Sequence, residues 1–165
     1  MNPSPILKTV LWPDEVATAH FAQTLAQSLV HQGLDGCITL NGDLGAGKTT
    51  FVRYLLRALG VSGRIKSPTY AVVEPYEVPL SSTSGTHNVG VWHFDFYRFS
   101  DAREWEDAGF RDLFASPGLK VCEWPERVEA LLPLVDLQMH LHALDEHQRE
   151  VELVAQTARA MEWLA

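Results

Sequence analysis

The eight residues from Gly42 to Thr49 constrain this chain more than any other stretch. They read Gly-Asp-Leu-Gly-Ala-Gly-Lys-Thr and match the pattern G-x-x-x-x-G-K-[ST], which wraps the phosphates of a nucleoside triphosphate. An apolar run at 37–40 precedes them, and a run with helical spacing at 50–59 follows. A strand, a glycine-rich turn and a helix in direct succession are the context that this motif requires. The sequence therefore predicts a nucleotide site rather than a surface turn with a solvated lysine.

Each residue type in this loop has a physical task. Glycine lets the backbone turn sharply and bring its N–H groups against phosphate oxygens, and the positive end of the following helix adds to that cradle. Lys48 is expected to reach the β- and γ-phosphates as a point charge. The Thr49 hydroxyl is expected to ligate Mg²⁺.

Length and charge narrow the class of protein. The chain has 165 residues, of which 46% are hydrophobic, so it is expected to form a single domain with its own core. Its 13 Lys and Arg against 21 Asp and Glu give a net charge of −8, which disfavours a protein that grips nucleic acid by itself. Without an apolar run of about 18 residues or a basic-then-apolar leader, we expect a cytoplasmic protein with no membrane contact.

The remaining segments suggest one α/β domain over 1–165. Residues 1–12 are expected to form a tail or an edge strand, and helical spacing begins near Asp14 and ends at Gly33. The Ser-, Thr- and Gly-rich segment 79–88 predicts a flexible hairpin connection. Alternation over 136–144 and 150–155 predicts a C-terminal β-hairpin.

Two further strands are predicted to end in an acid. The run 89–95 ends at Asp95, and the run 119–123 ends at Glu123. A phosphate-binding loop needs a carboxylate at a strand end near Mg²⁺, and the residues alone do not rank these two candidates. His93 lies beside aromatic residues and is interpreted as a packing residue. Pro68 interrupts an extended run and predicts a bend that aims Thr69 into the structure.

Four blocks together resemble the TsaE family, the bacterial ATPases of tRNA threonylcarbamoyladenosine biosynthesis. They are Gly42 to Thr50, Lys66-Ser67-Pro68-Thr69-Tyr70, His93-Phe94-Asp95-Phe96-Tyr97-Arg98 and Glu123-Trp124-Pro125-Glu126. The resemblance runs from about residue 13 to 155, with the blocks in the family's order. The segment 101–114, with Gly109-Phe110-Arg111-Asp112, is similar to the family's acidic helix. The connection 81–88 looks longer than is usual in the family.

The resemblance implies a fold, an activity and partners. The fold would be a single P-loop NTPase domain of the α/β class, with a mixed, mostly parallel sheet and helices on both sides. The activity would be binding and slow hydrolysis of ATP with Mg²⁺. The partners would be the transferase TsaD and its companion TsaB, which modify ANN-decoding tRNAs beside the anticodon. Contacts with the tRNA would be made mainly by these partners.

The resemblance also assigns roles to residues. Thr49 and Glu123 would hold Mg²⁺, together with Asp95 as the essential strand-end acid, and Thr69 would act as a switch near the γ-phosphate. The catalytic residues would be Lys48, Thr69, Asp95 and Glu123. The nucleotide-binding residues would be Glu15, Leu44, Gly45, Ala46, Gly47, Lys48, Thr49, Thr50, Trp124 and Arg149.

Other classes of protein share the loop. A stand-alone small-molecule or protein kinase would need an acceptor pocket and usually a basic lid, and the sequence has no Arg-rich lid segment. A GTPase is disfavoured because the guanine-reading pattern Asn-Lys-x-Asp does not occur. A nucleotide-binding regulatory module without catalysis stays open, because slow turnover and pure binding look alike in a sequence.

Overall fold

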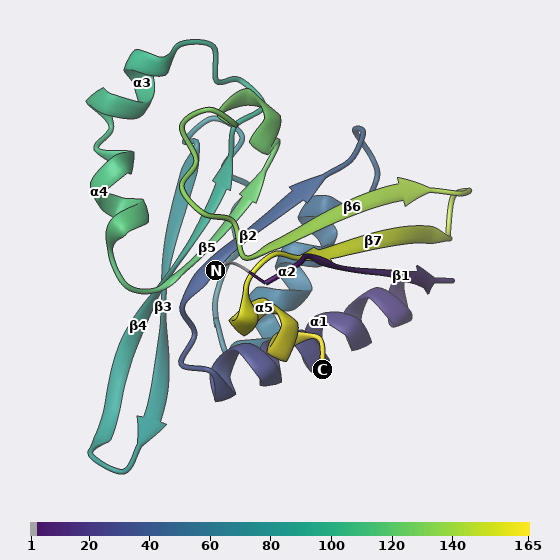
Figure 1. Ribbon diagram of the computed structural model, residues 1–165, viewed down its shortest axis with the longest axis horizontal. Coiled ribbons are helices and arrows are strands. Elements are labelled where there is room, and N and C mark those ends of the chain that lie inside the picture. Colours follow the sequence, from purple (N-terminus) through teal and green to yellow (C-terminus); the bar gives the residue numbers. More distant parts are fainter. Residues whose placement is uncertain (1–2) are drawn as a thin grey trace.

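The computed structural model describes residues 3–165, so residues 1 and 2 of the expected N-terminal tail lie outside the described residues. Strands and helices alternate along much of the chain (Figure 1). In order, they are β1 (Ile6–Trp12), α1 (Glu15–His31), β2 (Gly36–Asn41), α2 (Lys48–Ala58), β3 (Val73–Ser82), β4 (Gly85–Asp95), α3 (Ala102–Asp107), α4 (Phe110–Ala115), β5 (Leu119–Glu123), the 3₁₀ turn η1 (Pro125–Arg127), β6 (Leu137–Ala143), β7 (Arg149–Ala155) and α5 (Ala158–Trp163).

The strands form one sheet in the order β1-β7-β6-β2-β5-β4-β3. The central strands β6, β2, β5 and β4 run parallel to one another, whereas β1, β7 and β3 add antiparallel pairs at the two edges. β6 and β7 are the C-terminal hairpin, and β1 is an edge strand within the first 12 residues. The predicted α/β class with a mixed sheet is therefore confirmed.

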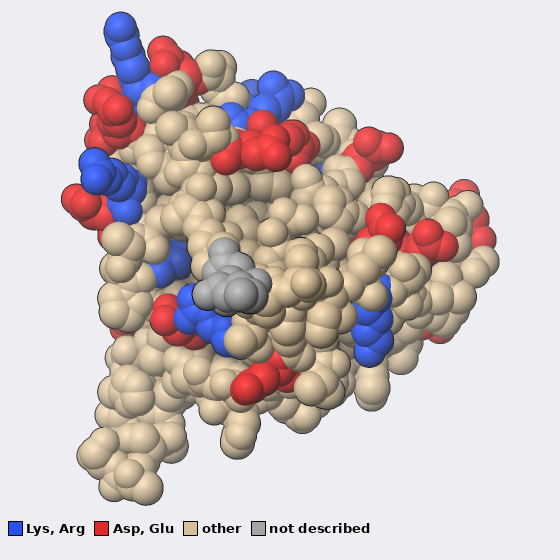
Figure 2. Space-filling model, viewed as in Figure 1, with Lys and Arg blue, Asp and Glu red and all other residues tan. Residues whose placement is uncertain are grey.

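The long hairpin β3–β4 differs from the flexible connection expected over 79–88. Only Thr83 and Ser84 form the turn, and the flanking residues pair strand to strand as far as Ser82 with Gly85. Buried Val78 and Leu80 tie β3 to the core, and cross-strand pairing satisfies the backbone of the polar residues beyond them. The hairpin extends away from the rest of the sheet (Figure 1), and its end is free of charged side chains (Figure 2).

Charged side chains are mixed on the face shown in Figure 2. Lys and Arg side chains lie scattered there, with Asp and Glu side chains close to them.

None of the helices within residues 3–165 has the length and hydropathy that a membrane-spanning segment requires. The two cysteines, Cys37 and Cys122, are both buried and free.

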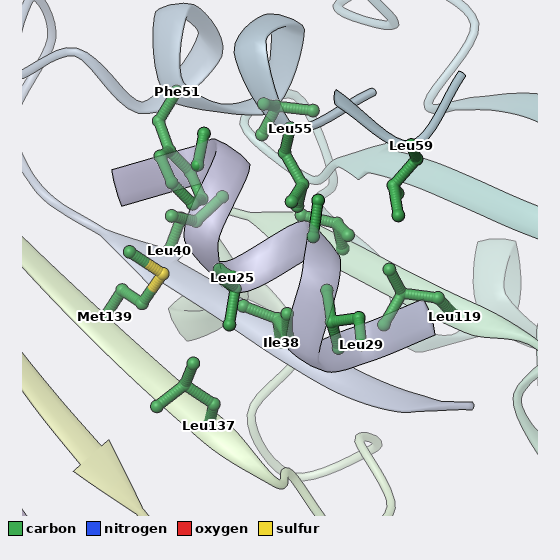
Figure 3. Close-up of a cluster of buried hydrophobic side chains, with 14 of the residues drawn as sticks. Leu25, Leu29, Ile38, Leu40, Phe51, Leu55, Leu59, Leu119, Leu137 and Met139 are labelled. Atoms are coloured by element: carbon green, nitrogen blue, oxygen red, sulfur yellow. The ribbon is translucent and has the colours of Figure 1, made fainter. Parts of the chain in front are cut away.

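Helices cover the sheet on both faces, and each layer has its own apolar cluster. On one face α1 and α2 bury a cluster that the labelled side chains of Figure 3 outline. These are Leu25, Leu29, Ile38, Leu40, Phe51, Leu55, Leu59, Leu119, Leu137 and Met139. On the other face α3 and α4 pack an aromatic cluster against β4, centred on Phe94 with Phe110 and Phe114. These two layers hold the carboxyl ends of β2, β4 and β5 in fixed positions.

Candidate nucleotide site

The glycine-rich loop joins the end of β2 to the start of α2. Gly42 has φ 154°, and a Cβ there would lie 2.7 Å from the carbonyl oxygen of Leu141. Gly47 has φ 100°, in the left-handed region, and immediately precedes the helix. The first glycine lets the loop pass close to β6, and the second turns the chain into α2. The loop therefore presents its amides and the N-terminus of α2 to one side.

Lys48 points back into this loop. It is 5% exposed, and its Nζ donates to the carbonyl oxygens of Gly42 and Asp43, the latter at 3.3 Å. The same ammonium lies 3.9 Å from the ring centroid of Trp124. Burial lowers the pKa of Lys48, while the negative charge of Glu123 is the largest influence that opposes the shift. An anion in the loop would give this charge a stronger partner than backbone carbonyls.

Thr49, in the first turn of α2, meets Glu123, the last residue of β5. The Thr49 hydroxyl donates to Oε1 of Glu123 at 2.8 Å. The other carboxylate oxygen, Oε2, lies 2.6 Å from Nε2 of His93, and Glu123 is only 2% exposed. A buried carboxylate beside a threonine hydroxyl is an arrangement that suits an Mg²⁺ ion and its water shell.

Asp95 lies directly beside Glu123, because β4 and β5 are parallel and these two residues are register partners. Its Oδ1 accepts from the backbone N–H of Tyr97 at 2.9 Å, and its Oδ2 is 3.4 Å from the Thr69 hydroxyl. Burial raises the pKa of Asp95, partly opposed by the hydrogen bond from Tyr97. Thr69 also contacts the Ser67 hydroxyl at 2.9 Å. Its contact with Asp95 shows that the bend around Pro68 brings Thr69 to the end of β4.

A cavity of about 340 Å³ joins these groups. Trp124 closes one side with its backbone in the left-handed region at φ 56°, and its ring lies 4.9 Å from that of Tyr97. The lining residues are Asp43, Leu44, Gly45, Ala46, Gly47, Lys48, Thr49, Thr50, Thr69, Asp95, Tyr97, Glu123, Trp124 and Arg149. With one exception, Glu15, the cavity therefore brings together every residue that the sequence assigned to the site.

Glu15 and Arg149 border a second, smaller cavity of about 130 Å³, which shares Gly47, Thr50 and Arg149 with the first. It is lined by Trp12, Glu15, Thr18, Gly47, Thr50, Glu146, His147 and Arg149. Arg149 donates from Nε to the Ala46 carbonyl at 2.9 Å and from Nη1 to the Asp145 carbonyl at 2.9 Å. It thus ties the β6–β7 turn to the glycine-rich loop, and it borders both cavities.

The side chains that could hold a metal ion in the larger cavity are few. Within residues 3–165 there is no group of three or more His, Cys, Asp and Glu side chains arranged to hold a metal ion. Thr49, Asp95 and Glu123 instead offer one hydroxyl and two carboxylates on one side of the cavity. Mg²⁺ is commonly held by one or two carboxylates together with substrate phosphates and water, and this donor set fits such a site.

Sequence reasoning missed His93 as part of the site. It is buried as a packing residue would be, at 1% exposed, yet its Nε2 contacts the Glu123 carboxylate. Within the described residues its Nδ1 atom has no hydrogen-bond partner. The signal was available in the spacing, because His93 lies two residues before Asp95 and therefore on the same face of β4. Tyr54, which donates to Glu15 at 2.6 Å, left no signal in the sequence.

Comparisons with known proteins identify the family and the fold to which this chain is similar. A family model described as threonylcarbamoyl adenosine biosynthesis protein TsaE matches residues 12–151. The tRNA threonylcarbamoyladenosine biosynthesis protein TsaE of Haemophilus influenzae is 37% identical over 147 residues, which cover 88% of this chain and 87% of the relative. Its counterpart in Bacillus subtilis is 35% identical over 118 residues, covering 72% and 68%. The crystal structure of Bacillus subtilis YdiB matches with a TM-score of 0.67 at 25% identity, covering 96% of this chain and 93% of YdiB.

Proposed function

This chain belongs to the TsaE family of tRNA threonylcarbamoyladenosine biosynthesis proteins, and we propose that within that pathway it is a magnesium-dependent ATPase. The observation that carries the proposal is the single cavity in which the glycine-rich loop, Lys48 and Thr49 face Asp95 and Glu123. A cation, backbone amides and two carboxylates that line one cavity suit a triphosphate bridged to Mg²⁺.

In this proposal each group has one task. The loop amides and Lys48 bind the phosphates, and Thr49 and Glu123 hold Mg²⁺. Asp95 acts at the strand end through the metal and the attacking water, and Thr69, which contacts Asp95, follows the state of the γ-phosphate. Mg²⁺ supplies charge stabilisation to the transferred phosphoryl group when it is bound. Trp124 covers the phosphate end, and Glu15 and Arg149 border the cavity proposed for the nucleoside.

The proposed partners are TsaD and TsaB, with tRNA contacted mainly through them. A net charge of −8 supports this division, because tRNA binding needs clustered Lys and Arg. On the face shown in Figure 2, Lys and Arg are mixed with acidic side chains rather than gathered in one patch. Since the modified tRNA is a cytoplasmic molecule, the proposal also assigns the protein to the cytoplasm.

The proposal is tested by measuring phosphate release from ATP and from GTP. Each measurement is made in the presence and in the absence of TsaD, TsaB and tRNA. A TsaE-type ATPase releases phosphate from ATP and responds to the partners. Consumption of ATP with a small acceptor, regardless of the partners, would identify a stand-alone kinase instead. A non-catalytic nucleotide-binding module would bind ATP and release no phosphate in any mixture.

The coupling of hydrolysis to tRNA modification has its own test. We propose that hydrolysis resets the transferase complex between turnovers. A Lys48→Ala protein, which loses a charge-assisted contact to the triphosphate, should then support a first round of modification and stall afterwards. Repeated turnover at the rate of the unaltered protein would refute the resetting role while leaving ATP binding by the unaltered protein in place.

A further inference from the structure

Two exposed side chains near the larger cavity contact each other, and the proposed function uses neither of them. The guanidinium carbon of Arg98 lies 4.4 Å from the ring centroid of Tyr70, within the range of a cation–π contact. Tyr70 directly follows Thr69, and Arg98 lies in the turn that follows Asp95. We propose that Tyr70 and Arg98 are positioning residues, whose contact holds the Thr69 hydroxyl against the Asp95 carboxylate. This inference rests on the proposed function, because Thr69 and Asp95 belong to the proposed site.

The contact joins two turns of the chain. The first turn, 68–72, is closed by a hydrogen bond of 2.7 Å from its last N–H to its first carbonyl oxygen, and it contains Thr69 and Tyr70. The second turn, 96–99, is closed in the same way at 2.9 Å and contains Arg98. Because each turn is closed by its own hydrogen bond, the contact between Tyr70 and Arg98 fixes the two turns relative to each other.

The other contacts between these segments involve Asp95. The Thr69 hydroxyl is 3.4 Å from Oδ2 of Asp95, which is longer than the usual hydrogen bond of a hydroxyl group. The backbone N–H of Asp95 donates to the Val72 carbonyl oxygen at 2.8 Å. Val72 has φ 68°, a left-handed conformation that a β-branched residue rarely adopts. The surroundings must therefore hold the first turn in a strained conformation, and the Thr69 contact is too long to do so by itself.

Tyr70 is the partner that the structure gives to the charge of Arg98. The ion pairs found among residues 3–165 have His93, His142 and Arg159 as their cations. Tyr70 is 83% exposed, so burial of its ring does little to order it, and its contact with Arg98 is the interaction that remains. A cation–π contact at an exposed site shifts a local equilibrium about two- to fivefold. The fraction of molecules in which the two turns are held together should depend on the contact by this factor.

Substitutions remove the contact from either side. Tyr70→Leu removes the ring and Arg98→Met removes the charge, whereas Tyr70→Phe keeps a ring face and should retain most of the hydrolysis rate. We expect each of the first two variants to lower the single-turnover rate of ATP hydrolysis about two- to fivefold. The dissociation constant of ATP should stay nearly unchanged, because neither side chain lines the larger cavity. Arg103→Met is the matched control, since it removes an exposed positive charge on α3, away from that cavity.

Amide hydrogen exchange gives a second measurement, which needs no nucleotide. If the contact holds the two turns together, its loss exposes the N–H groups of Val72 and Asp95 more often. Both N–H groups should then exchange about two- to fivefold faster in Tyr70→Leu and in Arg98→Met. The N–H of Leu59, which is hydrogen-bonded at the end of α2, should exchange at the same rate in all proteins.

A double-mutant cycle completes the test. Once Tyr70→Leu has removed the contact, adding Arg98→Met should lower the hydrolysis rate no further. Additive losses, or a loss in Arg103→Met as large as that in Arg98→Met, would overturn the inference. So would unchanged exchange of the two N–H groups in both variants. An unaltered protein that hydrolyses no ATP would overturn the proposed function instead, and the exchange rates alone would then decide whether the contact holds the two turns together.

Discussion

The Nε2 atom of His93 lies 2.6 Å from Oε2 of Glu123, and the two side chains are 1% and 2% exposed. The other oxygen of this carboxylate accepts from Thr49, so Glu123 is held from both sides. The tautomer of His93 that carries its proton on Nε2 donates to Glu123 and leaves no ring N–H buried without a partner. His93 thereby fixes the rotamer of the carboxylate proposed to hold Mg²⁺.

Loss of this contact should affect the metal more than the nucleotide. We predict that His93→Ala lowers Mg²⁺ affinity or Mg²⁺-dependent hydrolysis about ten- to a hundredfold, as is usual for partners of metal-binding side chains. His93→Gln should retain more activity, because its amide N–H extends to about the position of Nε2. Phosphate release followed against Mg²⁺ concentration measures the effect. Activity of His93→Ala that matches the unaltered protein at low Mg²⁺ would contradict it.

Substitution of the two strand-end acids, Asp95 and Glu123, should affect ATP hydrolysis more than ATP binding. In the proposed function both acids act through metal and water. Asp95→Ala and Glu123→Ala should therefore keep most of the affinity for ATP and reduce hydrolysis on the order of a hundredfold or more. Lys48→Ala is the opposite case, with a loss of about 1.5–3 kcal/mol in triphosphate binding. ATP dissociation constants and single-turnover rates, measured on the same preparations, distinguish the two classes. An acid whose removal leaves hydrolysis intact has been assigned wrongly.

Much of this site could be predicted because its residues follow local rules. The spacing of Gly42, Gly47 and Lys48 specifies a turn and a helix start within one stretch of chain. The runs that end at Asp95 and Glu123 are apolar strands, and strands buried in a parallel sheet place their carboxyl ends at one edge. The structure makes these two acids register partners, which confirms that the edge is shared.

Residues joined by tertiary contacts could not be predicted in the same way. Arg149 reaches the loop only because β7 lies two strands from β2, with β6 between them, and that order is not written in any local pattern. Tyr54 meets Glu15 through the packing of α2 on α1, across 39 positions of sequence. His93 was interpreted as packing because strand histidines beside aromatic residues usually are. That interpretation was incomplete, since its partner Glu123 comes from a strand 30 residues later.

Arg149 should act as a brace for the loop. Its guanidinium donates to the carbonyls of Ala46 and Gly45 on the loop and to those of Asp145 and Gln148 on the β6–β7 turn. Lysine at this position keeps the charge and loses the planar fork, so it cannot span both segments. We predict that Arg149→Lys weakens ATP binding about tenfold, in line with the loss of one or two hydrogen bonds to a charged group. Calorimetric titration with ATP measures this.

A loss of ATP affinity in Arg149→Lys can be attributed to the glycine-rich loop only if the fold is unaffected. The residue is the first of β7 and is only partly buried, so Arg149→Lys should change the unfolding midpoint in denaturant only slightly. Gln148→Ala, which removes the neighbouring side chain that contacts Asp145, is the matched control and should leave ATP affinity unchanged. Equal affinities of Arg149→Lys and the unaltered protein would show that the charge alone is enough at this position.

Ionised Asp95 should lower the stability of the ligand-free protein at neutral pH. Its pKa is raised by burial, so the folded state holds this proton more tightly than the unfolded chain does. The tighter binding of this proton stabilises the folded protein fully at pH values below 3.8, the ordinary pKa of aspartate in the unfolded chain. This contribution to the free energy of unfolding is lost as the pH rises through the raised pKa of the folded state. Asp95→Asn removes this titration, since asparagine is neutral at every pH and can still accept from the Tyr97 N–H.

We therefore predict that Asp95→Asn, although poor in hydrolysis, is more stable than the unaltered protein at pH 7 by about 1 kcal/mol in the absence of Mg²⁺ and nucleotide. The difference should shrink on acidification through the raised pKa, because the unaltered protein then takes up its proton. Denaturant unfolding at neutral pH and near the ordinary aspartate pKa measures both points. A difference that grows on acidification would mean that Asp95 is stabilised as an anion by its neighbours, and that its burial does not set its pKa.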